Sequence, residues 1–229
     1  MTTSPTPSRR EPVELVIFDW DGTLVDSIVG IVASVQAAVA ELGWPPREDE
    51  TIATLIGLDW QGACRVLYPD QSPADHVALA KAARRHNHQR PAPAPFPGAD
   101  TVLQSLRDCG CRLAVATSKP RTELDGELPQ TGLGPWITAS RTADETAPKP
   151  DPKMLVELLA ALDTPPHRAL MVGDSEYDLT MAARAGLVAV AANYGVHGFE
   201  RLARCRPAAH IDQLAELPSA LARCGFINL

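Results

Sequence analysis

The sequence has little that points to a membrane, to secretion or to nucleic acid. Its longest runs without a charged residue, 27–40 and 185–199, are shorter than the roughly 18–20 residues that a membrane-spanning helix needs. The first twelve residues, MTTSPTPSRREP, have no apolar segment, so we expect a disordered arm over residues 1–12 and not a signal peptide. Lys and Arg number 21 against 28 Asp and Glu, a net charge of −7, which argues against a dedicated nucleic-acid binder. Five cysteines, an odd number without paired spacings, suit a reducing compartment. These absences predict a cytoplasmic globular protein with neither a membrane nor a nucleic-acid partner.

Short apolar segments alternate with longer helical patterns along most of the 229 residues. The apolar segments, typical of strands buried on both faces, lie at 13–18, 112–116, 169–172 and 187–191. Stretches with helical periodicity lie between them, at 101–109, 152–162 and 176–185. This alternation predicts an α/β fold with a Rossmann-like parallel sheet and helices on both of its faces.

The segment 27–90 interrupts this alternation, because it contains helical patterns and no strand. Ile31, Val35 and Leu42 recur at helical spacing up to Gly43, and 74–88 has the composition of a further helix. The proline-rich run PAPAPFPG at 91–98 then leads back to the alternating pattern. We therefore predict a small all-helical insertion at 27–96, with a proline-rich return linker, and a core formed by 13–26 and 97–229; the family resemblance described below implies that this insertion is a cap domain.

Two carboxylates follow the first predicted strand, in the segment Asp19-Trp20-Asp21-Gly22. Ligands of parallel sheets bind beyond the carboxyl ends of the strands, so these side chains could share a metal ion and a substrate. Asp-Gly is also a common turn signal, and a turn without function is the alternative.

Polar residues also follow the second predicted strand, at 117–120 (TSKP), where hydroxyl and N–H groups can bind an anion or simply open a helix. Lys149 lies between two prolines, which restrict its backbone and would hold its ammonium group in place.

The third predicted strand is followed by GDSEYD at 173–178. Ser175 and Asp178 fit a helix capping box, which explains both residues without a function but leaves Asp174 unexplained. Several carboxylates and a lysine at neighbouring strand ends favour a hard cation with oxygen ligands, and we expect Mg²⁺.

With these four motifs, the sequence resembles the haloacid dehalogenase-like hydrolase superfamily, in its phosphoglycolate phosphatase-like branch with a helical cap. The resemblance rests on 19–27 (DWDGTLVDS), 116–120 (ATSKP), 149–152 (KPDP) and 173–178 (GDSEYD), and it covers nearly the whole chain from residue 13.

This resemblance implies a catalytic role for both aspartates of the first motif. Asp19 is expected to be the nucleophile that forms an aspartyl-phosphate. Asp21 is expected to be the general acid for the leaving alcohol and then the base for the hydrolytic water. Mg²⁺ is expected on the side chains of Asp19 and Asp174 and on the main-chain carbonyl of Asp21.

The resemblance further implies that Thr117 binds the transferring phosphoryl group and that Lys149 offsets the charge of this group and that of Asp19. Asp178 is expected to orient metal-bound water or Lys149. The remaining residues expected to contact phosphate or substrate are Gly22, Ser118 and Gly57, although Gly57 could equally be a helix cap.

The function implied is a Mg²⁺-dependent phosphatase of a small, phosphoglycolate-like phosphomonoester, acting as a monomer or homodimer. Asp21 favours a phosphatase or a sugar phosphomutase over a dehalogenase, and a phosphoacceptor signalling domain is a more distant alternative.

Trp20, Ser118 and Lys119 depart from the family pattern, and Lys119 competes with Lys149 as the lysine of the site. The basic stretch 81–90 could attract an anionic substrate, but a solvated helix face is the simpler interpretation.

Overall fold

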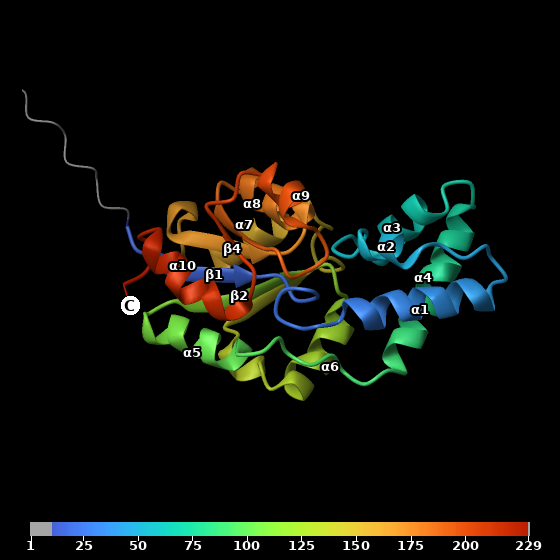
Figure 1. Ribbon diagram of the computed structural model, residues 1–229, viewed down its shortest axis with the longest axis horizontal. Helices are drawn as coiled ribbons and strands as arrows, with labels where there is room; N and C mark the ends of the chain where they lie inside the picture. Colours follow the sequence, from blue (N-terminus) through green and yellow to red (C-terminus); the bar gives the residue numbers. More distant parts are fainter. Residues whose placement is uncertain (1–10, 229) are drawn as a thin grey trace, which may run out of the picture.

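A computed structural model describes residues 11–228, so most of the predicted N-terminal arm lies outside the described chain. Six strands form one parallel sheet in the order β3-β2-β1-β4-β5-β6 (Figure 1). The strands are β1 (Leu15–Phe18), β2 (Arg112–Thr117), β3 (Ala139–Thr142), β4 (Ala169–Gly173), β5 (Val188–Ala192) and β6 (Ala209–Ile211). The chain winds outward from β1 in one direction and then in the other, which leaves a switch point beside β1.

The register of the central strands brings three predicted motifs to one edge of the sheet. Phe18 at the end of β1 lies opposite Val115 of β2 and Val172 of β4. Because the strands are parallel, Asp19, Thr117 and Asp174 all leave the sheet at its carboxyl edge.

Helices cover both faces of this sheet, as predicted. Val16 and Phe18 of β1 pack with one set of helices, and Leu15 and Ile17 pack with the other. The first set is α5 (Ala99–Asp108), α6 (Arg121–Thr131) and α10 (Leu217–Arg223); the second is α7 (Lys153–Ala161), α8 (Glu176–Arg184) and α9 (Phe199–Ala203). Short 3-10 turns lie at Gly134–Trp136, Pro166–Arg168 and Leu214–Glu216. Within the described range, none of the helices has the length and apolar character to traverse a bilayer.

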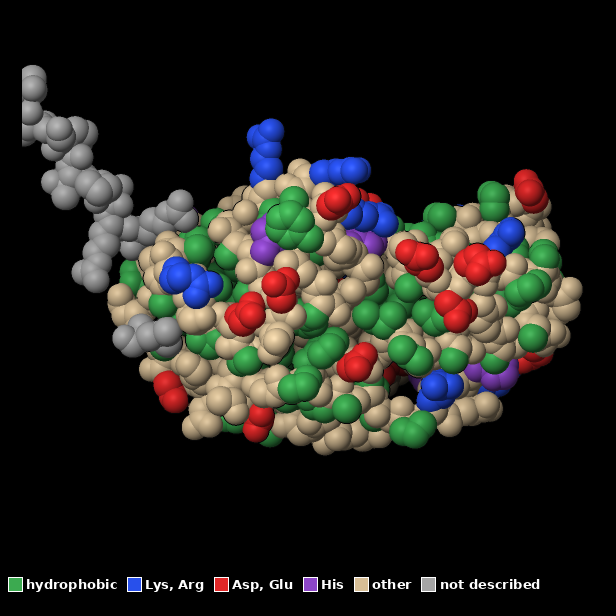
Figure 2. Space-filling view, in the orientation of Figure 1, with side chains coloured by type: hydrophobic (Ala, Val, Ile, Leu, Met, Phe, Trp, Pro, Cys, Tyr) green, Lys and Arg blue, Asp and Glu red, His purple; other side chains and the backbone are tan. Residues whose placement is uncertain are grey.

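The described segment between β1 and α5 contains helices joined by loops, with no strand longer than an isolated bridge, and its helices share a hydrophobic core of their own. It contains α1 (Ile28–Glu41), α2 (Asp49–Ala53), α3 (Trp60–Leu67) and α4 (Pro73–His88). It forms a lobe beside the sheet, and Figure 2 shows a notch between the two lobes. The expected fold class, a Rossmann-like α/β core with a helical insertion after the first strand, is therefore confirmed.

The two chain segments that join the lobes run side by side. The N–H of Asp26 donates to the carbonyl of Ala94 (2.9 Å), and the N–H of Phe96 donates to the carbonyl of Leu24 (2.9 Å). The proline-rich return linker is thus paired with the outgoing segment over this short stretch.

The sequence did not predict β3, β6 or α6. The two strands lie at the edges of the sheet, where burial is incomplete, and their sequences ASRT and AHI lack a continuous apolar run. Helix α6 contains Gly126 and Pro129 and is mostly polar, so its composition carries little helical signal.

Candidate active site

The loop after β1 is folded tightly over the carboxyl edge of the sheet. The carbonyl of Trp20 accepts N–H groups from Thr23, Leu24 and Val25 at 3.0–3.3 Å, which closes a compact turn. Gly22 takes a positive φ of 79°, and a Cβ there would lie 2.4 Å from Oδ2 of Asp174. A glycine is therefore required at this position for the loop to approach Asp174. The turn packs directly against the carboxylate of Asp174.

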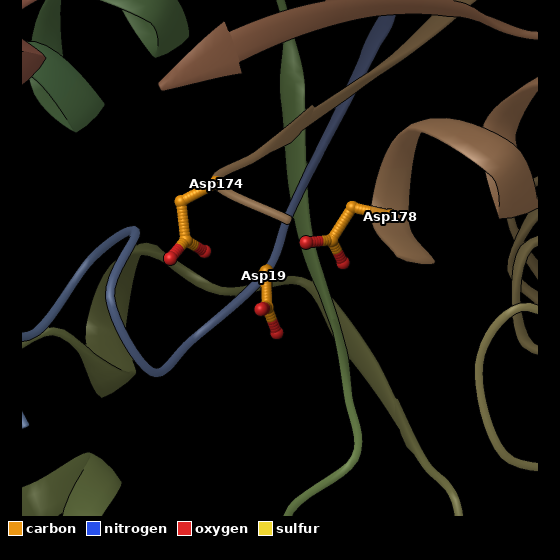
Figure 3. Close-up of side chains that lie close together, drawn as sticks. All are labelled: Asp19, Asp174 and Asp178. Carbon is orange, nitrogen blue, oxygen red and sulfur yellow. The ribbon is translucent and has the colours of Figure 1, made fainter. Parts of the chain in front are cut away.

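Three carboxylates from two motifs converge beside this loop. Ligand oxygens of Asp19, Asp174 and Asp178 lie within 4.8 Å of one another, and all three residues are buried (Figure 3). Burial raises the pKa of Asp19 well above its usual value, with Asp178 adding to the rise and Lys149 opposing it. Burial, followed by Asp178, raises the pKa of Asp174 to about 7. The cluster therefore favours positive charge at its centre, as a cation site requires.

Lys149 is the ammonium group of this cluster. Its Nζ lies 2.5 Å from Oδ1 of Asp19 and 2.7 Å from Oδ1 of Asp178, with the lysine side chain fully buried. Burial acts to lower the pKa of Lys149, but Asp178 and Asp19 outweigh it, so the pKa is raised and the group stays charged. Three carboxylates and one ammonium leave two negative charges, which match a divalent cation with oxygen ligands.

Both carboxylate oxygens of Asp174 and one oxygen of Asp178 accept hydrogen bonds from protein donors. Thr23 Oγ1 donates to Asp174 Oδ1 (2.8 Å), and the N–H of Val196 donates to Asp174 Oδ2 (2.8 Å). The capping box predicted for Ser175 and Asp178 is present, because Asp178 Oδ2 accepts from the Ser175 N–H and hydroxyl. Asp178 thus caps α8 with one oxygen and pairs with Lys149 through the other.

The motif after β2 faces the same space from the opposite side. Asp19, Asp21, Thr117 and Ser118 all line one cavity between the sheet edge and the helical insertion. The hydroxyl of Ser118 donates to the carbonyl of Gly57 in the insertion (2.6 Å). Gly57 therefore lies at the boundary between the lobes.

Lys119 occupies a separate place from Lys149. Its Nζ lies 3.3 Å from Oδ1 of Asp21, 2.8 Å from Oε1 of Glu127 and 4.0 Å from Oε2 of Glu123, and the lysine side chain is buried. Burial acts to lower the pKa of Lys119, but Asp21 and Glu127 together raise it by more, so the pKa is raised overall. The two lysines that the sequence left in competition are thus both at the site, each with a different aspartate of the first motif.

Sequence reasoning missed Glu123 and Glu127, which belong to α6. The two glutamates are four residues apart, which places them on one face of a helix just after Lys119, and this spacing is the signal that could have found them. Glu123 also accepts from Arg84 Nε of the insertion (2.6 Å), and Glu127 accepts from Trp20 Nε1 (2.7 Å).

The basic stretch 81–90 lies mostly away from the cavity. Arg84 pairs with Glu123 of the core, whereas Arg85 and His86 pair with Glu41 on an exposed surface of the insertion. None of the basic residues in this stretch lines the cavity over Asp19.

Comparison with known proteins gives the family of the chain and agrees with its fold. The family described as haloacid dehalogenase-like hydrolase matches residues 16–192, more than half of the chain. The chain belongs to this family. It is 33% identical over 214 residues to the "Probable phosphatase IndB" of Dickeya dadantii, covering 90% of this chain and 92% of that protein.

A second relative is the plasmid-encoded phosphoglycolate phosphatase of Cupriavidus necator. It is 33% identical over 216 residues, which cover 92% of this chain and 94% of the relative. A solved structure of a hydrolase from Pseudomonas syringae superposes with a TM-score of 0.85 at 22% identity, over 95% of this chain and all of that chain. The predicted membership of the haloacid dehalogenase-like family, and the likeness to its phosphoglycolate phosphatase-like branch, are confirmed.

Proposed function

We propose that this protein is a Mg²⁺-dependent phosphatase that hydrolyses a small phosphorylated metabolite through an aspartyl-phosphate on Asp19. The observation that carries the proposal is the contact of Lys149 Nζ with both Asp19 and Asp178 beside a buried carboxylate cluster. A carboxylate nucleophile is repelled by a phosphate dianion, and a fixed positive charge beside it reduces this repulsion. The relatives named as phosphatases support the same reaction class.

The side chains of Asp19 and Asp174 and the main-chain carbonyl of Asp21 would hold Mg²⁺. Bound there, the ion would offset the charge of the phosphate and of Asp19. Asp178 would orient Lys149 and the water around the ion, since its two oxygens already engage Lys149 and Ser175. The donor set fits, because it consists of oxygen atoms and carries an excess of negative charge.

In the first step, a carboxylate oxygen of Asp19 attacks phosphorus, and the bond from phosphorus to the alcohol oxygen breaks. Asp21 gives its proton to the departing oxygen. In the second step, water attacks phosphorus, Asp21 takes a proton from it, and the bond to Asp19 breaks, which restores the free carboxylate. Division of the displacement into two steps replaces one high barrier with two lower ones.

The phosphoryl oxygens would be bound by Thr117 and Lys149 and by backbone groups at Gly22. Ser118 and Gly57, joined by a hydrogen bond, would position the substrate where the two lobes meet. The helical segment 27–96 would act as a cap domain on the core of 13–26 and 97–229, excluding water from the aspartyl-phosphate until the leaving group has gone.

The partner of the enzyme would be a small phosphate ester, and the protein would act in the cytoplasm as a monomer or homodimer. The five cysteines are free, which agrees with a reducing compartment.

Phosphate release from a panel of phosphomonoesters, with Mg²⁺ and with a chelator, tests the proposal. We expect metal-dependent release by the wild type and at least about 1,000-fold lower kcat for Asp19→Asn. Wild-type turnover in Asp19→Asn would refute the nucleophile. Interconversion of sugar phosphate isomers without net phosphate release would instead identify a phosphomutase, and a long-lived phospho-aspartate would identify a signalling domain.

A further inference from the structure

The cavity over Asp19 does not end at the sheet but continues among the helices of the insertion. Core residues line its floor: Asp19, Asp21, Thr117, Ser118, Lys119 and Glu123. Residues from α1, α3, α4 and the segment around α2 line the rest. A phosphomonoester placed for attack by Asp19 would therefore direct its alcohol group into the insertion and away from the core.

The wall that the insertion contributes is apolar. Within the described part of the chain, it presents no charged side chain to this cavity. The wall is formed by aliphatic and aromatic residues, among them Ile31, Val35, Ile52, Leu55, Leu58 and Trp60. Such a wall cannot replace the water that surrounds a charged leaving group.

The cations nearest the cavity are already paired with protein carboxylates. Lys119 contacts Asp21 and Glu127, and Lys149 contacts Asp19 and Asp178. Arg84, which lies outside the cavity lining, contacts Glu123. A carboxylate on the leaving group would therefore meet cations that already pair with protein carboxylates. Desolvation in the apolar region opposes such a substrate.

From this cavity we infer that the preferred substrate is the phosphomonoester of an uncharged, predominantly apolar alcohol, and not phosphoglycolate. Because the inference rests on the phosphatase activity proposed above, the test must separate loss of that activity from a different substrate preference.

A pair of substrates with the same shape gives the cleanest comparison. Isobutyl phosphate carries two methyl groups where phosphoglycolate carries two carboxylate oxygens. We expect kcat/KM for isobutyl phosphate to exceed that for phosphoglycolate by about tenfold or more, because only the latter brings a charge to the apolar wall. Along methyl, ethyl and propyl phosphate, kcat/KM should rise by up to roughly fourfold per methylene until the cavity is filled.

A variant of the wall tests whether these side chains set the preference. Leu58 lines the cavity and is only half-buried, so Leu58→Lys can place an ammonium group there. We expect this change to raise the ratio of kcat/KM for phosphoglycolate to that for isobutyl phosphate by about tenfold. Leu58→Met keeps the wall apolar and should retain the wild-type ratio. This control shows whether the added charge, and not substitution at this position as such, changes the ratio.

The matched control is Val66→Lys on α3, because Val66 is 58% exposed and lies outside the cavity wall. It adds the same charge to the insertion and should leave the ratio unchanged.

A wild-type preference for phosphoglycolate over isobutyl phosphate, without a rise along the alkyl series, would overturn the inference while the phosphatase activity stands. Absence of Mg²⁺-dependent phosphate release from every ester, including a chromogenic aryl phosphate, would overturn the proposed function and the inference with it.

Discussion

The Nζ of Lys119 lies 3.3 Å from Oδ1 of Asp21, so the second aspartate of the first motif is paired with a lysine from the motif after β2. The same lysine donates to Glu127 of α6, and Glu127 accepts from Trp20, the residue between the two aspartates. The first motif is thus held at Trp20 by Glu127 directly and at Asp21 by Lys119, which Glu127 also binds. This arrangement fixes the direction of Asp21 relative to Asp19.

Replacement of Lys119 should damage both stability and turnover. Lys119→Met leaves the carboxylates of Asp21, Glu123 and Glu127 without their shared buried cation, and the loss of one partner of such a group costs about 3–5 kcal/mol. Chemical denaturation should show a loss of this size, and the folded fraction should have a lower kcat with a nearly unchanged KM, because Asp21 loses its orientation.

Lys153→Met is the control for this change, since Lys153 is exposed at the start of α7. It should match the wild type in stability and in kcat. A Lys119→Met protein with normal stability and turnover would show that the contact with Asp21 has no role.

Asp21→Asn should separate proton transfer from metal binding. The amide cannot donate or accept the proton of the reaction, so kcat should fall by about 100-fold or more. Because the metal contact proposed for this residue is its main-chain carbonyl, Mg²⁺ should still raise the thermal midpoint of the variant. Loss of that Mg²⁺-dependent shift would contradict the assignment of the carbonyl as the ligand.

The stabilisation by Mg²⁺ should depend on pH in a defined direction. Asp174 has a usual pKa of 3.8 and a raised pKa of about 7 in the folded protein. The folded state therefore binds a proton that the unfolded state releases, and the stability that this group contributes is lost as pH rises from 3.8 through about 7. A cation must displace this proton, so the Mg²⁺-induced rise in thermal midpoint should be larger at about pH 8 than at about pH 5.5.

Asp174→Asn is the appropriate control, because it removes the titrating group and one metal ligand. Its thermal midpoint should respond weakly to Mg²⁺ at both pH values. A wild-type shift of equal size at both pH values would argue against a protonated Asp174 in the metal-free protein.

The contact of Arg84 with Glu123 should contribute to stability, since it joins α4 of the insertion to α6 of the core. The Glu123 side chain is 2% exposed, so Arg84→Met removes a donor from a buried carboxylate and should cost about 1–3 kcal/mol in the free energy of unfolding. Arg85→Met removes a neighbouring guanidinium that pairs with Glu41 in solvent and should leave stability close to that of the wild type. Equal stability of the two variants would contradict this difference.

The strands that could be predicted from the sequence are those whose burial requires a run of apolar residues. Strands β1, β2, β4 and β5 are buried, and each is a short apolar run. The edge strands β3 and β6 are partly exposed and partly polar, and helix α6 is held by its position against the sheet more than by its own sequence. These elements escaped prediction because tertiary packing, and not local propensity, specifies them.

The sequence by itself determined which residues meet. Asp19, Thr117 and Asp174 each follow a buried parallel strand, and strands of this kind must present their carboxyl ends along one edge. Only the tertiary structure showed that Lys119 pairs with Asp21 and Glu127, that Lys149 contacts Asp178 as well as Asp19, and that the insertion lines the cavity with an apolar wall. Ion pairs and cavity walls depend on distances between segments far apart in the chain, and a one-dimensional pattern does not contain those distances.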